Sequence, residues 1–166
     1  MESHVGDYFD IIVDEEATEE EALALGTSVV EWLISEGIIG GELTGNVLGS
    51  DLGYPPGPNS EKAGGEKVPD CRTNGMELII GRTVFHSMGG EIHLICSECG
   101  TCFQPPDECG DAIGEWYGRT GSGLLTCVQC GHKKPITEWR HDPPWAFGNL
   151  GFKFWNWPPL AESFIQ

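Results

Sequence analysis

The chain has 166 residues, enough for one compact domain or for a domain with a small appended module. Hydrophobic residues make up 39% of it and six are Trp, which predicts a packed core and excludes global disorder. The net charge of −17 repels phosphate backbones and anionic membranes, which argues against direct nucleic-acid contact. No stretch approaches the roughly 18 apolar residues of a membrane-spanning helix, and the first residues do not resemble a signal peptide, so we expect a cytoplasmic protein.

The negative charge is concentrated in the first part of the chain. Residues 1–70 carry 16 Asp and Glu against two Lys, a net charge of −14, whereas residues 71–166 carry 10 against seven Lys and Arg, a net charge of −3. Such a surface keeps a protein in solution, and it also suits the docking of a basic partner.

The first predicted elements are a strand over residues 8–14, which is aromatic and β-branched, and a helix over residues 19–36. Thr18 and Glu21 have the spacing of a capping box at the start of this helix, and Gly37 suits a left-handed stop after it. The apolar stripe of the helix is predicted from residues at helical spacing: Ala22, Leu25, Val29 and Trp32, with Leu33.

Residues 40–75 are rich in Gly and Pro and are predicted to form a long irregular connection. Both an interaction loop centred on Tyr54 and a plain linker fit this composition.

Strands are predicted again after this connection. Residues 76–80 and 83–86 read as one strand or a bulged pair around Gly81, and residues 91–95 as the hairpin partner after a turn at Gly89 and Gly90. Further strands are predicted over residues 123–126, 136–139 and 152–155, and a short helix over residues 160–165.

Seven cysteines are present, and four of them form two Cys-x-x-Cys-Gly motifs at Cys96, Cys99, Cys127 and Cys130. An odd count in a reducing compartment favours metal binding over disulfides. Two residues between thiolates let a tight turn direct both sulfurs at one ion about 2.3 Å away, and two such turns complete a tetrahedron.

These motifs resemble the knuckles of the zinc-ribbon family, over roughly residues 92–135. The resemblance implies one zinc ion with the four cysteines as its ligands. The chain departs from the compact form of the pattern, because 27 residues (100 to 126) separate the two motifs against about 15–20 in a compact site. Residues 101–122 are therefore expected to project as a hairpin or lobe.

Several alternatives remain open at this site. Iron suits the same four thiolates, as in rubredoxins, but most of this chain lies outside the ribbon, which favours zinc. His93 and His132 are each an alternative to one cysteine ligand, although His132 with Lys133 and Lys134 more simply offsets the charge of the thiolates.

The remaining cysteines have no assigned role. Cys99 and Cys102 have the spacing of a redox dithiol, but Cys99 is used by the metal site and no helix is predicted there to lower a thiol pKa. Cys102 and Cys109 fit buried small side chains or a loop pair, and Cys71 is treated as a spectator.

No catalytic motif is found. The P-loop, Gly-x-Ser-x-Gly, His-Glu-x-x-His and zinc-deaminase patterns are all absent, so we expect no enzyme. His86, His93 and His141 are the candidates if an unrecognised active site exists. The Trp-rich C-terminal third is predicted to pack in the core, with an exposed protein-binding patch as the alternative.

The predicted fold class is α+β: a small antiparallel sheet with one main N-terminal helix and a zinc-ribbon module. We expect an N-terminal α/β part over residues 1–90, the ribbon over residues 91–135, and aromatic-rich strands over residues 136–166 that pack on the same sheet.

The expected function is a non-enzymatic, acidic module that binds a basic protein. In composition and layout the chain is similar in character to bacterial immunity-type proteins, which implies an inhibitor of a basic toxin. The alternatives are a nucleic-acid or transcription-linked zinc-ribbon protein, and an enzyme with an unrecognised site.

Overall fold

The computed structural model describes residues 8–45, 47, 52–69, 73–86 and 91–166. It divides into two compact units, which we describe separately. Unit 1 contains the described residues up to Gly81 together with Gly148–Gln166, and unit 2 is Arg82–Phe147. Among the described residues, no helix combines the length and the apolar composition needed to cross a bilayer.

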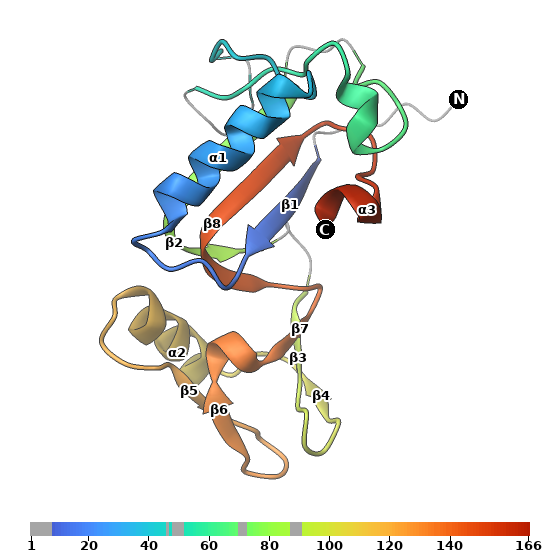
Figure 1. Cartoon of the computed structure of the whole chain (residues 1–166). Coiled ribbons are helices and arrows are strands. Elements are labelled where there is room, and N and C mark those ends of the chain that lie inside the picture. The colour runs from blue at the N-terminus through green and yellow to red at the C-terminus, as the bar shows by residue number, and fades with distance from the viewer. Residues whose placement is uncertain (1–7, 46, 48–51, 70–72, 87–90) are drawn as a thin grey trace. The chain divides into compact units, whose positions relative to one another are not determined.

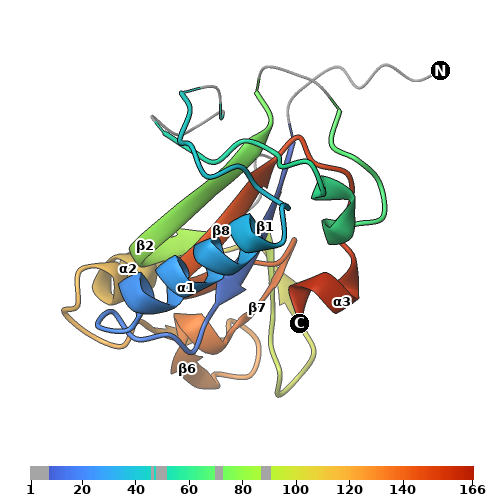
Figure 2. The same ribbon diagram turned by 45° about the horizontal axis from the view of Figure 1, so that its top comes forward.

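Unit 1 is built on a three-stranded sheet with one long helix on its face (Figures 1 and 2). The strand order is β1-β8-β2, with β1 at Phe9–Asp14, β8 at Ala146–Trp155 and β2 at Gly75–Phe85. β1 runs antiparallel to β8, and Ile12 pairs with Phe152. β8 is central and largely buried, because it is covered on both edges by other strands. The predicted strand over residues 8–14 and the single strand around Gly81 are both confirmed.

Helix α1 spans Ala22–Ser35 and begins with the predicted capping box. The Glu21 backbone N–H donates to Thr18 Oγ1 at 3.2 Å, and the Thr18 N–H donates to Glu21 Oε2 at 3.3 Å. Gly37 has φ +73°, which confirms the left-handed stop. The two residues that follow, Ile38 and Ile39, are buried and fix the chain after the helix.

The predicted apolar stripe of α1 was correct at Ala22, Val29 and Leu33, which lie in or against the core, and wrong at Leu25 and Trp32. The buried residues are Ala22, Gly26, Val30 and Leu33, whereas Leu25 and Trp32 are 41% and 50% exposed. Gly26 explains the shift, since a Cβ at this position would lie 3.0 Å from Leu150 Cδ1 and 3.1 Å from Leu78 Cδ1. The helix therefore approaches the sheet through its one residue without a side chain.

The rest of unit 1 closes around this layer. The connection over residues 40–75 is mostly irregular, with a 3₁₀ turn η1 at Ser60–Ala63 and isolated bridges, one of which joins Tyr54 to Met76. A short helix α3 at Glu162–Ile165 confirms the predicted terminal helix. The core contains residues from all of these segments: Ala17, Ala22, Val30, Leu33, Ile38, Ile39, Ala63, Met76, Leu150, Phe152, Phe154 and Trp157.

Unit 2 consists of two small antiparallel sheets and a helix. One sheet has the order β4-β3-β7 and the other pairs β5 with β6. The bounds are β3 His93–Ile95, β4 Cys102–Phe103, α2 Asp107–Tyr117, β5 Leu124–Thr126, β6 Lys133–Pro135, η2 Ile136–Glu138 and β7 Arg140–Asp142. Leu94, Leu125 and Ile136 are almost fully buried at the centre of its core, beside Trp139 and Phe147. The predicted core role of Trp139 is therefore confirmed, as it is for Trp155 and Trp157 in unit 1.

One predicted strand pairing and one predicted strand were wrong. The strand that leads into Cys96 pairs with β4 and β7, not with β2, and the turn predicted at Gly89 and Gly90 lies outside the described residues. The predicted strand over residues 136–139 contains the 3₁₀ turn η2 instead, because Pro135 is the last residue of the β5–β6 ladder and the chain turns there before it enters β7. The predicted fold class is correct: the structure is α+β with small antiparallel sheets and one main N-terminal helix.

We expect Thr18→Ala to lower the free energy of unfolding by about 1 kcal/mol, because it removes one half of the capping box. Thr27→Ala is the matched control, since Thr27 is exposed within the same helix and Ala is the better helix former. Chemical denaturation followed by far-UV circular dichroism measures both. Equal stabilities of the two variants would show that the capping box does not hold the helix start.

Candidate metal centre

The four cysteines lie at the tips of two short hairpins in unit 2. Cys96 follows β3 directly, and the chain returns as β4 with Ile95 paired to Cys102. Cys127 follows β5 in the same way, and the chain returns as β6 with Thr126 paired to Lys133. Each motif therefore occupies a turn of the same length.

The two turns are also alike in their hydrogen bonds. In the first, the Cys96 N–H donates to Thr101 O at 3.0 Å and the Gly100 N–H donates to Cys96 O at 2.9 Å. In the second, the Cys127 N–H donates to His132 O at 2.8 Å and the Gly131 N–H donates to Cys127 O at 3.1 Å. The two glycines have φ of +73° and +76°, a conformation that costs a residue with a Cβ free energy. The Gly of each motif is thus required by the turn.

The sulfur positions fit one tetrahedral ion. The Cys96 and Cys130 sulfurs are 3.7 Å apart, as are those of Cys99 and Cys127, and all four lie within 4.8 Å of one another. A metal–sulfur bond of about 2.3 Å gives a tetrahedron with edges of about 3.8 Å. A disulfide would need about 2.05 Å, and all four cysteines are free thiols. The structure thus brings together the four cysteines singled out in the sequence, in a geometry that could bind a metal ion.

Each turn contributes one buried and one exposed cysteine. Cys96 and Cys127, the first of each pair, are buried in the unit 2 core, and Cys99 and Cys130 face solvent. The buried pair joins the site to a core cluster that also contains Leu94, Leu125 and Ile136. Loss of the site would therefore disturb the core as well as the surface.

Polar contacts also connect the two turns. Lys134 Nζ, beside the second turn, lies 2.9 Å from Ser97 Oγ in the first and 5.2 Å from the centre of the Trp139 ring. The Trp139 indole N–H donates to Lys134 O at 3.1 Å. His132 Nε2 lies 3.9 Å from Glu98 Oε1, so this histidine faces a carboxylate of the opposite turn. Lys134 thus reaches the residue that follows Cys96, and its role in offsetting the charge of the thiolates stays a prediction.

The surroundings of the thiols lower the pKa of Cys99 and Cys127 and raise that of Cys130. Hydrogen bonds from the side chain and backbone of Thr101 lower the pKa of Cys99 to about 6, and the backbone N–H of Cys130 is the main cause of a lowered pKa at Cys127. At Cys130 the backbone N–H of His132 favours the thiolate, but desolvation and the three neighbouring sulfurs outweigh it and raise the pKa to about 12. Four thiolates so close repel one another unless a cation is present.

The other candidate ligands lie outside this cluster. Among the described residues, the group that could hold a metal consists of the four cysteines alone. His93 lies in β3 opposite Asp142, and His132 contributes its carbonyl to the second turn. Cys102 is an exposed free thiol in β4, and Cys71 lies outside the described residues.

The insertion between the motifs holds a helix that the sequence analysis missed. α2 places Cys109 and Ala112 in the core, and burial raises the pKa of the Cys109 thiol. A signal was available: Pro106 precedes two acidic residues, and Cys109, Ala112 and Trp116 recur at helical spacing. The expected lobe over residues 101–122 therefore contains β4 and a helix that packs back on the core.

His86 and His141 both stack on Trp145. The ring centres are 4.8 Å apart for His86 and 5.5 Å apart for His141, whose ring is nearly parallel to that of Trp145. His141 is buried, and burial lowers its pKa, which favours the neutral ring. Its Nδ1 lies 3.0 Å from Trp139 O, and its Nε2 has no hydrogen-bond partner among the described residues.

Comparison of the chain with protein-family models, with curated proteins and with solved structures finds no match. The interpretation of the site therefore depends on its own geometry.

We expect the purified protein to contain one metal ion per chain and to lose it on Cys99→Ser. Cys102→Ser is the matched control, because Cys102 is also exposed and lies in the same hairpin but outside the sulfur cluster.

Chelation should unfold unit 2 while α1 stays protected, which hydrogen exchange read by mass spectrometry resolves segment by segment. Unchanged protection in unit 2 after complete removal of the metal would show that the site is not structural.

Metal affinity should fall as pH falls, because each thiol must lose its proton to bind the ion. A thiol whose pKa is raised, as at Cys130, still carries its proton at neutral pH, so the ion must displace it. We expect the affinity, measured against a competing chelator, to drop at least tenfold from about pH 8 to about pH 6. A pH-independent affinity would mean that no thiol proton is displaced on binding.

Proposed function

We propose that the four cysteines hold a structural zinc ion. Structural zinc sites are tetrahedral with four protein ligands, whereas catalytic sites keep one position open for water or substrate. Four sulfurs with tetrahedral spacing leave no such position here, and this observation carries the proposal. Cys96, Cys99, Cys127 and Cys130 are the ligands, in a module of the zinc-ribbon type.

Zinc is preferred to iron for this site. Both metals accept four thiolates, but an iron centre of this kind serves electron transfer. In this chain the site joins two hairpins to a buried core, and unit 1 forms a larger second part of the chain, which suits a structural role. A colourless protein with stoichiometric zinc in elemental analysis supports the assignment, and a red protein with iron would overturn it.

The protein as a whole acts by binding another protein, and we propose a basic partner. The support is the uneven charge, with 16 acidic residues against two Lys among residues 1–70. Opposite charge speeds the encounter of two proteins and selects against acidic competitors. An inhibitor of a cationic toxin, in the manner of bacterial immunity proteins, is the concrete form of this proposal. A reducing compartment keeps cysteines from forming disulfides and so leaves them able to bind zinc. We therefore place the protein in the cytoplasm.

Nucleic-acid binding is the weaker alternative. Several of the nine Lys and Arg already have internal partners: Lys134 is held at Ser97 and Trp139, and Lys153 packs over the rings of Phe9 and Trp155 at 4.0 and 4.6 Å. Lys62 pairs with Glu36 at 3.0 Å. A chain of net charge −17 that uses its cations internally has little left for phosphates.

We expect the zinc-loaded protein to inhibit a basic nuclease domain encoded beside its gene at stoichiometric concentrations. Association should slow at least tenfold between low and about 0.3 M salt, because screening weakens attraction between exposed charges. A duplex DNA and a single-stranded RNA serve as matched probes and should show no gel shift at low salt. Nucleic-acid binding without binding to the basic domain would overturn the proposal.

A further inference from the structure

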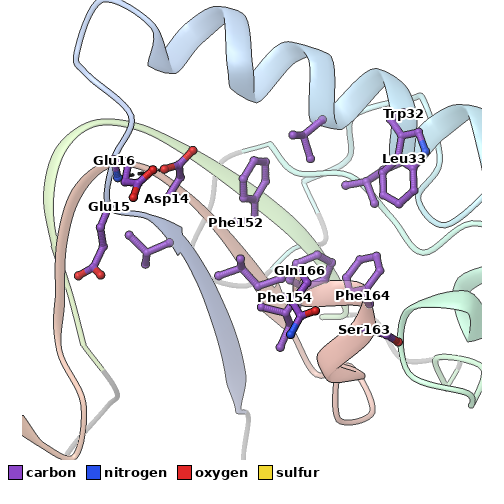
Figure 3. Close-up of a pocket in the computed structure, with 14 residues that line it drawn as sticks. Asp14, Glu15, Glu16, Trp32, Leu33, Phe152, Phe154, Ser163, Phe164 and Gln166 are labelled. Carbon is purple, nitrogen blue, oxygen red and sulfur yellow. Dashed lines mark hydrogen bonds between the residues drawn. The ribbon is translucent and has the colours of Figure 1, made fainter.

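Unit 1 contains an apolar groove of about 770 Å³ (Figure 3). Its walls are formed by β1, β8, α1 and the end of α3, with Phe152 and Phe154 between Trp32 and the end of β1. Trp32 stacks on Phe164 with 6.5 Å between ring centres, although it remains 50% exposed. A groove of this size is within the range of about 300–1,000 Å³ that is typical of binding sites. The exposure of Trp32, at odds with its predicted burial in the core, is explained if it lines such a site.

One end of the groove is acidic. Figure 3 shows Asp14, Glu15 and Glu16 together where β1 ends, opposite the Trp32 end. Asp14 Oδ1 accepts the backbone N–H groups of Glu16 and Ala17, both at 3.0 Å, which fixes the turn. Glu15 and Glu16 are exposed, and none of the described residues that line the groove is basic. The groove therefore has an apolar end and a negatively charged end.

The groove also runs along a free strand edge. β1 is the outer strand of its sheet in the described part of the chain, with β8 on its other side. Ile12 and Val13 are consecutive, so their side chains point to opposite faces, yet both line the groove with Asp14. The groove therefore follows the last three residues of β1, the outer strand of this sheet in the described part of the chain. An edge strand beside an apolar groove is the arrangement that accepts an added strand.

We propose that this groove binds an extended segment of a partner protein that combines an apolar side chain with Lys or Arg. The segment adds to the edge of β1, its apolar side chain occupies the Trp32 end, and its cation lies at Glu15 and Glu16. The proposal deepens the proposed function and rests on it for the basic character of the partner. Charge complementarity selects this occupant, because a second copy of the chain would bring like charge to the acidic end.

The probe is a peptide of alternating Val and Lys about as long as β1, with capped ends, titrated into the zinc-loaded full-length protein at about 0.15 M salt, where charges outside the groove are largely screened. Fluorescence anisotropy of a labelled peptide reports binding. The same peptide with Glu in place of Lys is the charge control and should not bind. Peptides N-methylated on one or the other alternating set of residues test the backbone pairing, because only one set faces the edge of β1.

Two variants locate the binding on the protein. Glu15→Lys/Glu16→Lys should weaken binding about tenfold, through lost attraction and added repulsion. Glu31→Lys/Glu42→Lys makes the same change in net charge at exposed residues of unit 1 outside the groove, and should change binding by no more than about twofold. Trp32→Ala should weaken binding about tenfold, and Leu23→Ala, at a 63% exposed residue of the same helix, should leave it unchanged. Ile165→Glu, at an exposed residue of α3, is a second test of the apolar end that leaves the core intact.

The outcomes separate this inference from the proposed function. Loss at Glu15, Glu16 and Trp32, with one N-methylated peptide inactive, supports the groove and the added strand. Equal binding by all the protein variants overturns the groove, while a basic partner that still binds leaves the proposed function standing. Binding that needs the groove but tolerates both N-methylated peptides overturns the extended segment in favour of a helix or a small cation. If neither the peptide nor the basic nuclease domain binds, both proposals fail.

Discussion

Four sulfur atoms with tetrahedral spacing connect the two hairpins of unit 2. Its two hairpins share no strand, and the chain that joins them carries a separate helix. Unit 2 spans residues 82–147, which is 66 residues, and a hydrophobic core of that size rarely supplies more than about 3–5 kcal/mol of stability by itself. A metal bound by both turns would close the loop between them and draw Cys96 and Cys127 into the core. Unit 1 has no such need, since its helix and sheet bury a continuous apolar layer.

Local chemistry made much of this structure predictable. The capping box at Thr18 and Glu21 and the stop at Gly37 fix both ends of α1 through hydrogen bonds and φ that involve neighbouring residues only. The sulfur cluster was visible for the same reason, because Cys-x-x-Cys-Gly is a complete turn within five residues. Each turn was predicted to come directly after a strand, because apolar residues typical of strands precede each motif.

Tertiary packing accounts for what could not be predicted. The buried face of α1 is set by Gly26, which lies against Leu78 and Leu150 from distant strands. A pattern of hydrophobic residues at helical spacing does not include glycine, so it could not predict this contact. The partners of β3 are β4 and β7, one of which lies far along the chain, so adjacency in sequence suggested the wrong pair. The groove at Trp32 was also hidden, because helical spacing placed that side chain in the core and only the phase of α1 turns it outward.

The alternation of buried and exposed cysteines gives the metal centre two unequal sides. Cys96 and Cys127 end strands and are enclosed by the core, whereas Cys99 and Cys130 lie one turn further out, in water. If the site holds a metal ion, a small thiol or chelator would meet the outer pair first, while the inner pair would still hold the ion. Cys99 and Cys130 would then let the ion exchange, and Cys96 and Cys127 would keep it attached to the core.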